Sequence, residues 1–231
     1  MSERATLGLM GKHPGYGDFL KTGISDDIAE ALTAWLDPVL MSLRDEMADN
    51  WAPFWDGAQD LRFWVGRAVL GRTLVGVLRP WRDRVGRRYP LLLIAESAAV
   101  LPPVLAPKDQ APWEALHAHL HAMTPGQGAK ALLDGLKAPI PREDEVTAGT
   151  GPTVWAHHPE GDLAQLLESA APVDADRAQL ARSYWWATGG AGRSSVWMGT
   201  PGLPQAPALG WLLAGVPSAA PEEESAPDDE Q

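Results

Sequence analysis

Three histidines alternate in the segment HAHLH (residues 117–121), and their spacing could bind a metal ion. On a helix, His117 and His121 lie one turn apart, so both imidazoles could be ligands of one ion. A metal centre normally takes a third protein ligand, and no acidic residue is placed in the sequence to suggest one. We therefore expect these histidines to lie on the solvated flank of a helix, and we expect no metal site.

Two aspartates in glycine-rich segments are the other candidates for chemistry. Asp18 lies in GYGDF, where Gly17 permits a positive φ and Phe19 is expected to anchor the segment in the core. Asp83 lies in PWRDRVGRRYP between two arginines, where its carboxylate should be paired. We hypothesise that one of these aspartates ties the two segments together through an arginine. The alternative is a hydrolase, which requires Asp18, Asp83 and a histidine to meet in one pocket.

Familiar catalytic and nucleotide-binding motifs are absent from the sequence. It contains no GxSxG elbow, no GxxxxGK[ST] loop, no HExxH pair and no GxGxxG turn after a strand. The run GGAGRSS (189–195) resembles a phosphate-binding loop only superficially, because SSVWMG has the pattern of a strand and not of a helix. We expect a plain turn there.

Arginines are concentrated in residues 62–88, where eight of them accompany a single acidic residue, Asp83. They are Arg62, Arg67, Arg72, Arg79, Arg82, Arg84, Arg87 and Arg88. Planar guanidinium groups suit bidentate recognition of carboxylates and phosphates. Three interpretations stay open: residues that face solvent or pair with the acidic body, a docking face for an acidic or phosphorylated partner, and a site that captures the chain's own acidic tail.

The composition limits the class of protein. The chain has 231 residues, a formal charge of −11 and no cysteine, which excludes disulfides, thiol nucleophiles and cysteine-based metal sites. The acidic body argues against non-specific binding to nucleic acid. Residues 217–231 carry six acidic and no basic side chains among proline, alanine and serine, which predicts a disordered acidic tail. Without a recognisable signal peptide or membrane-spanning segment, we expect a cytoplasmic protein with no membrane insertion.

Apolar periodicity predicts both strands and helices. Strands are expected over residues 5–10, LRFWVGRAV, TLVGVLRP, PLLLIAE and TVWAH, and SYWWAT and SSVWMG should form a hairpin. Helices are expected from Ser25, with a kink or restart at Pro38, over APWEALHAHLHAM, around Gly161–Ala170 and over ALGWLLAG, with a short one in GQGAKALLDGLK.

These elements predict an α/β (α+β) fold in a single domain over residues 1–216. Several neighbouring strands are joined by turns too short to hold a helix, so the central sheet should be largely antiparallel. We expect a compact sandwich in which helices flank this sheet. Trp185 and Trp186 are adjacent on a strand, so their indoles should lie on opposite faces of the sheet.

Two long segments carry motifs that belong together. Residues Gly11–Phe19 read GKHPGYGDF after a short apolar strand, and residues 76–91 read GVLRPWRDRVGRRYPL. They are similar to the GK-x-P-x-x-GDF and GVL-x-P-S-x-DRVGR-x-FPL elements of the TagF family of type VI secretion-associated proteins, with Trp81 where the family commonly has serine. SYWW (183–186) and GLP (202–204) are similar to later elements of that family. The resemblance runs from about residue 7 to residue 214.

The resemblance implies a cytoplasmic accessory protein without a cofactor, and not an enzyme. TagF-like proteins act as post-translational repressors of type VI secretion and are linked to its forkhead-associated (FHA) scaffold protein. We therefore expect a repressor that binds this scaffold, with the arginine-rich residues 62–88 as its docking surface; the alternative is a structural or assembly subunit of the secretion machine. The family-motif residues expected to bind the partner are Gly11, Lys12, Pro14, Gly17, Asp18, Phe19, Arg79, Asp83, Arg84, Val85, Gly86, Arg87, Pro90, Trp185 and Trp186.

Overall fold

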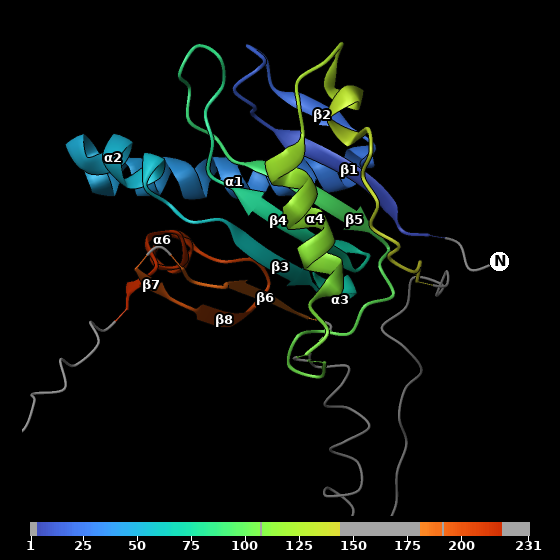
Figure 1. The fold of residues 1–231 in the computed structure, drawn as a ribbon. Helices are drawn as coiled ribbons and strands as arrows, with labels where there is room; N and C mark the ends of the chain where they lie inside the picture. The colour runs from blue at the N-terminus through green and yellow to red at the C-terminus, as the bar shows by residue number, and fades with distance from the viewer. Residues whose placement is uncertain (1–3, 107, 144–180, 191, 219–231) are drawn as a thin grey trace, which may run out of the picture.

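A computed structural model describes residues 4–106, 108–143, 181–190 and 192–218. Within these residues, seven strands form one sheet in the order β2-β1-β5-β4-β3-β6-β8, and all neighbours run antiparallel (Figure 1). The strands are β1 (Thr6–Gly11), β2 (Leu20–Thr22), β3 (Leu61–Val65), β4 (Leu74–Arg79), β5 (Leu91–Glu96), β6 (Arg182–Ala187) and β8 (Val196–Pro201). A small second sheet pairs β7 (Arg193–Ser194) with β9 (Val216–Pro217).

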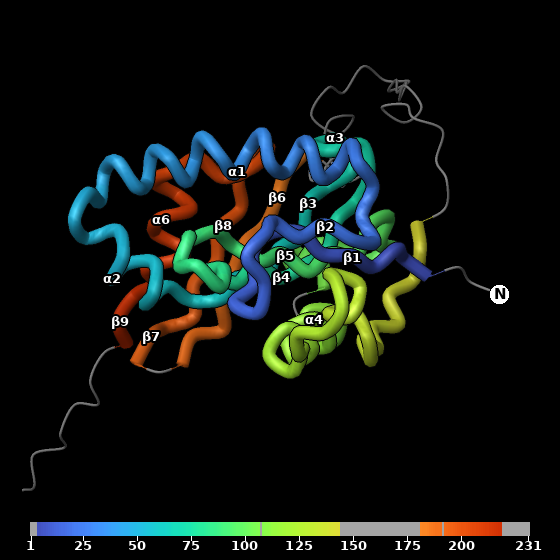
Figure 2. Tube along the Cα trace, turned by 90° about the horizontal axis from the view of Figure 1, so that it is seen from above, coloured from blue at the N-terminus to red at the C-terminus, as the bar shows by residue number. Residues whose placement is uncertain are grey.

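Helices cover both faces of the large sheet. One face carries α1 (Asp26–Met47), the short 3-10 turn η1 (Ala48–Asn50), α2 (Trp51–Asp56) and α6 (Ala206–Ala214). The opposite face carries α4 (Ala111–Ala122) and the 3-10 turn η2 (Ala129–Leu133). Figure 2 shows α1 and α6 on one side of the strands and α4 on the other, while α3 (Arg67–Leu70) lies beside the N-terminal end of α1. The predicted α+β sandwich with an antiparallel sheet is confirmed.

Two hydrophobic cores fill the spaces between the layers, and Trp185 and Trp186 each belong to a different one. The Trp185 indole stacks on Phe63 at 4.8 Å between ring centroids, in the core beneath α1. The Trp186 indole meets the edge of Trp113 from α4, also at 4.8 Å. The prediction that the two indoles lie on opposite faces is confirmed, and both are buried.

Helix α1 runs through Pro38 without interruption, so the predicted restart is wrong. A proline in the fifth or later position of a helix leaves the carbonyl four residues earlier without its helical partner. Here both Pro38 and Ala34 are exposed, so water can hydrogen-bond the Ala34 carbonyl. The buried Trp35 and Leu36 before the proline and Val39 after it hold the helix against the sheet.

Other predictions have mixed outcomes. The strand expected over TVWAH, the helix around Gly161–Ala170 and residues 219–231 of the expected tail lie outside the described residues. The segment GQGAKALLDGLK forms the 3-10 turn η2 and not an α-helix. The run GGAGRSS leads into strands, as expected of a plain turn. Among the described helices, none combines the length and the apolar character needed to cross a membrane.

Candidate partner-binding site

The loop of residues 80–90, which joins β4 to β5, is organised around the buried carboxylate of Asp83. Its Oδ1 accepts the backbone N–H groups of Val85 (3.0 Å) and Arg87 (2.9 Å). Its Oδ2 accepts the Arg87 Nε–H (2.6 Å) and lies 3.3 Å from the Lys12 ammonium. Burial alone would raise the pKa of Asp83, but the hydrogen bonds from Arg87 and Lys12 and the charge of Lys12 hold this pKa far below its usual range.

Asp83 also ties this loop to residues 11–19, the last residue of β1 and its connection to β2, which we call the 11–19 loop. The same Arg87 guanidinium that pairs with Asp83 donates to the Gly17 carbonyl oxygen. The Arg84 backbone N–H donates to the Tyr16 carbonyl at 2.8 Å. The hypothesis that one aspartate joins the two segments through an arginine is therefore confirmed for Asp83. Asp18 is exposed, and no described residue forms a hydrogen bond or an ion pair with it.

Gly11 allows the two loops to approach each other closely. Its φ is +122°, and a Cβ at this position would lie 1.9 Å from the Pro90 carbonyl oxygen. The same buried Pro90 accepts the Lys12 backbone N–H through that oxygen, at 3.3 Å. Gly86 also has a positive φ, +91°, whereas Gly17 does not, so the expected role of Gly17 as a left-handed residue is wrong. Gly17 instead accepts a hydrogen bond from Arg87 through its carbonyl oxygen.

The other side of the 11–19 loop rests on the loop that follows α4. The Tyr16 hydroxyl accepts the Gly126 N–H at 2.8 Å. His13 is buried with its ring edge against Trp81, 4.6 Å between centroids, and its Nδ1 accepts the Gly15 N–H at 3.0 Å. Burial and, secondarily, the charge of Arg79 lower the pKa of His13. Pro14 sits at the exposed turn of this loop.

A groove of about 590 Å³ lies between α1 and the 80–90 loop. We call it the α1 groove. Its walls combine apolar and cationic side chains, including Leu40, Met41, Arg44, Trp51, Arg87 and Tyr89. The Tyr89 hydroxyl donates to Asp37 at 3.1 Å, and burial and the Asp37 charge raise the pKa of Tyr89 well above its usual value, so this hydroxyl stays protonated.

One large apolar side chain of the groove wall, Met41, is exposed, and two others, Phe19 and Val85, are exposed next to groove residues. Met41 is 63% exposed, Val85 68% and Phe19 43%. The expectation that Phe19 anchors the core is wrong, because its ring lies at the surface against the edge of Tyr89, with 5.4 Å between centroids. The sequence gives no signal for this position, since an apolar side chain after a loop is typical of a core anchor as well.

The arginines of residues 62–88 do not share one face. Arg72 pairs with Asp27 at the start of α1, while Arg88 makes a bidentate pair with Asp56 in α2, beyond the other end of that helix. A helix of 22 residues spans about 33 Å, so these two arginines are far apart. Arg67, Arg79, Arg82 and Arg87 pair with acidic residues too, as the first interpretation expects. Arg84 is exposed and has no ion pair within the part of the chain that the structure describes.

The docking surface that the geometry offers is therefore narrower than residues 62–88. It consists of the α1 groove, whose walls include Arg44 and Arg87, together with the exposed apolar side chains near it and the exposed Arg84 of the same 80–90 loop. The buried Trp185 and Trp186 lie outside it and hold the layers together. Met41 and Arg44 were missed, because only the packing of α1 shows which of its positions border the loop. Tyr89 lies in the motif segment 76–91, but only the structure shows that it lines the groove.

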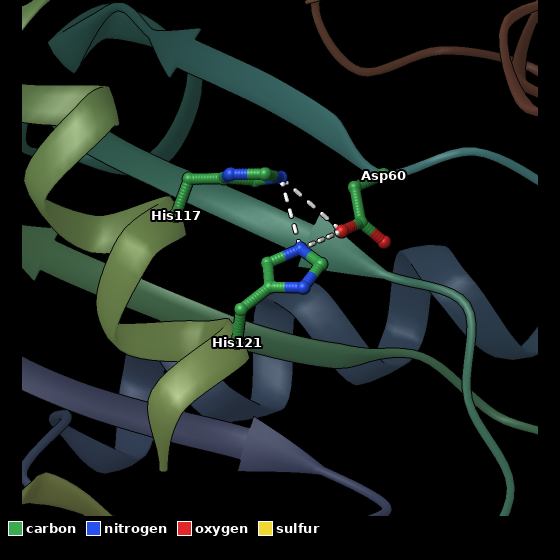
Figure 3. A group of neighbouring side chains, drawn as sticks. All are labelled: Asp60, His117 and His121. Carbon is green, nitrogen blue, oxygen red and sulfur yellow. Dashed lines mark hydrogen bonds and ion pairs between the residues drawn. The ribbon is translucent and has the colours of Figure 1, made fainter. Parts of the chain in front are cut away.

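The expectation about the histidines is also wrong in one respect. His117 and His121 lie on a partly exposed flank of α4, as expected, but an acidic residue does stand beside them (Figure 3). Asp60 Oδ2 is 3.2 Å from His117 Nε2 and 2.7 Å from His121 Nε2. Asp60 was missed because it precedes His117 by 57 positions in the sequence, at the start of β3.

The fold and its two interlocked loops belong to a class of proteins associated with type VI secretion. A family model described as the TagF N-terminal domain, type VI secretion system-associated, matches residues 8–138, which include both loops. The chain belongs to this family. The crystal structure of PA0076 from Pseudomonas aeruginosa PAO1 is similar, with 27% sequence identity and a TM-score of 0.67, over 96% of this chain and 100% of that one. No curated protein matches the chain.

Proposed function

We propose that the protein represses type VI secretion after translation by binding the FHA-domain scaffold protein of that system through the α1 groove. The family supports the association with secretion. The observation that carries the proposed surface is a groove that has arginines and the exposed Met41 in its walls. Two more exposed apolar side chains adjoin it: Phe19 packs on the groove residue Tyr89, and Val85 precedes the groove residue Gly86.

The chemistry of this surface suits a protein partner. Exposed apolar patches on a folded protein mark interaction sites, and arginine and aromatic side chains supply most of the binding energy in such interfaces. Arg44 and Arg84 are cationic and exposed on a protein whose overall charge is −11. The local positive charge therefore favours an acidic or phosphorylated segment of the partner, which arginine binds through paired hydrogen bonds.

The contacts that Asp83 makes within the two loops support a binding role over catalysis. Asp83, which a hydrolase would need as a free carboxylate, is buried and accepts from Arg87 while pairing with Lys12. A carboxylate held in this way stabilises the loop and is not free to activate water. The ties to Gly17 and Tyr16 order the loops before the partner arrives, so less conformational entropy is lost on binding.

The direct functional test is overproduction in the parent cell, with the amount of secreted tube protein as the readout. We expect export to fall when the wild-type chain is overproduced, and we expect the R44E/R84E variant to leave export unchanged. The K108E/K137E variant carries the same change of charge on two exposed lysines of the α4 side and should repress as the wild type does. Unaltered export with the wild-type chain would contradict the repressor role, and loss of export on deletion would favour an assembly subunit.

A further inference from the structure

We propose that Asp60, His117 and His121 bind one divalent transition-metal ion of the zinc type. Their ligand atoms converge from two elements on one point, and all three lie within 4.8 Å of one another (Figure 3). Nothing in the family resemblance assigns a role to these residues, and the inference does not depend on the proposed repressor function.

The spacing of the donor atoms matches one face of a tetrahedral metal site. The Nε2 atoms of His117 and His121 are 3.2 Å apart, and Asp60 Oδ2 lies 3.2 Å from the first and 2.7 Å from the second. Zinc bonds to nitrogen and oxygen of about 2.0–2.1 Å place neighbouring ligands about 3.3–3.4 Å apart. Two of the three distances between donor atoms are already close to this value. Only the distance between His121 Nε2 and Asp60 Oδ2 must increase.

The elements that carry the ligands are firmly packed. His117 and His121 stand one turn apart on α4, whose Leu116 and Leu120 are fully buried. Asp60 directly precedes β3, a central strand of the sheet. The Asp60 side chain is 18% exposed, while the two imidazoles are 34% and 44% exposed, so an ion can reach the ligands from solvent.

A fourth ligand can approach the three side chains from the side of Asp60. Asp60 and Arg79 line an open cleft of about 260 Å³ together with Asp56 and Trp81. Three protein ligands with one open position are typical of zinc sites that hold a water molecule or a partner's side chain. Water from this cleft can complete the coordination of the ion.

The donor atoms of the cluster suit a cation of intermediate softness. Burial alone would raise the pKa of Asp60, but a hydrogen bond from His117, the charge of Arg79 and a hydrogen bond from His121 lower it, so the carboxylate is ionised. Two imidazoles with one carboxylate select zinc and its neighbours among the transition metals, whereas magnesium and calcium require mostly oxygen ligands.

Arg79 opposes this ion and sets the tautomer of His121. Its Nη1 donates to His121 Nδ1 at 2.9 Å, so the proton of neutral His121 must lie on Nε2, where it faces Asp60. Metal binding through Nε2 moves this proton to Nδ1, and the Arg79 guanidinium then has to withdraw. The guanidinium carbon already lies over the Trp81 ring, 4.6 Å from its centroid, which gives the displaced cation a place to remain.

The test is a titration of the untagged full chain with Zn²⁺ by calorimetry and with Co²⁺ by visible absorption. We expect one ion per chain and the intense absorption of tetrahedral Co²⁺. H117A and H121A should each weaken binding at least about tenfold, and both leave the buried core intact. H119Q is the matched control on the same helix, because His119 points elsewhere and donates to the Leu132 carbonyl at 2.7 Å. The H157Q/H158Q variant controls for metal binding by His157 and His158, which are adjacent in the sequence.

The R79Q variant is the most specific test, because it changes metal affinity without removing a ligand. In R79Q the cation is removed, and the glutamine oxygen can accept the Nδ1 proton of the ligating His121, so we expect binding about tenfold tighter than in the wild type. Binding that is absent in both wild type and R79Q overturns the proposal. Binding that survives H117A and H121A but disappears in H157Q/H158Q overturns it as well.

Discussion

Arg87 holds Asp83 with one nitrogen and the neighbouring loop with another. Its Nε lies 2.6 Å from Asp83 Oδ2, and its Nη2 donates to the Gly17 carbonyl oxygen. One arginine thus closes the 80–90 loop on itself and locks it against the 11–19 loop. The shape of the proposed partner-binding surface depends on this pair.

Replacing Asp83 by alanine should therefore weaken both the fold and the surface. Lys12 and Arg87 lose their common anion, and two backbone N–H groups lose their acceptor. We expect Tm to fall by roughly 5–10 °C in a thermal unfolding experiment. Asp18→Ala is the control in the same pair of loops and should leave Tm unchanged, since the Asp18 side chain is exposed. Equal Tm values for both variants would show that Asp83 does not organise the loops.

The close approach of the loops at Gly11 makes a second prediction. Gly11→Ala places a methyl group against the Pro90 carbonyl at a positive φ, and strain and overpacking together should cost about 3 kcal/mol. Gly190→Ala is matched in φ, +102°, but a Cβ there meets nothing within 4 Å, so its cost should be about 1 kcal/mol. Urea unfolding of both variants measures the difference. Similar costs would mean that the contact with Pro90 is not tight in solution.

The exposed apolar side chains near the α1 groove should contribute to partner binding and not to stability. Val85→Glu is expected to weaken binding to the FHA scaffold at least about tenfold while the free energy of unfolding changes by no more than about 0.5 kcal/mol. Leu101→Glu is the control, because Leu101 is exposed to a similar extent, 60%, in a different loop. The prediction is wrong if Leu101→Glu weakens binding as much as Val85→Glu does.

Buried His13 should make stability depend on pH in the mildly acidic range. Because the pKa of His13 is lower in the folded chain than the usual histidine value of about 6.5, the unfolded chain binds the proton first. The neutral His13 contributes fully to the free energy of unfolding above about pH 6.5, and this contribution is lost as the pH falls through the lowered pKa. In His13→Asn the side-chain oxygen can still accept the Gly15 N–H but does not titrate, so urea midpoints should fall less between about pH 7 and pH 5. Parallel curves for the two proteins would contradict this.

The elements of the fold could be predicted because their signals are local. Alternating and continuous apolar runs identify β1, β3, β4 and β5, and the spacing of apolar residues identifies α1 and α4. Pro38 misled the prediction, because a proline interrupts a helix only where the orphaned carbonyl lacks another partner. At an exposed position, the packing of the residues on either side decides the outcome.

The site could be predicted only where its residues are neighbours in the sequence. Asp83 and Arg87 are four positions apart in one loop, so their pairing could be expected from the sequence. The arginines of residues 62–88 follow strands that run in opposite directions, and the antiparallel sheet separates them toward its two ends. Asp60 meets His117 and His121 only because α4 crosses the sheet, and no local pattern contains that information.

The central claim is that the α1 groove binds the FHA scaffold, and calorimetric titration of the purified scaffold with the purified chain tests it most directly. We predict that the wild-type chain and K108E/K137E bind with the same affinity, and that R44E/R84E binds at least about tenfold more weakly with an unchanged Tm. Equal affinity of R44E/R84E and the wild type, or no binding by the wild type, would contradict the account.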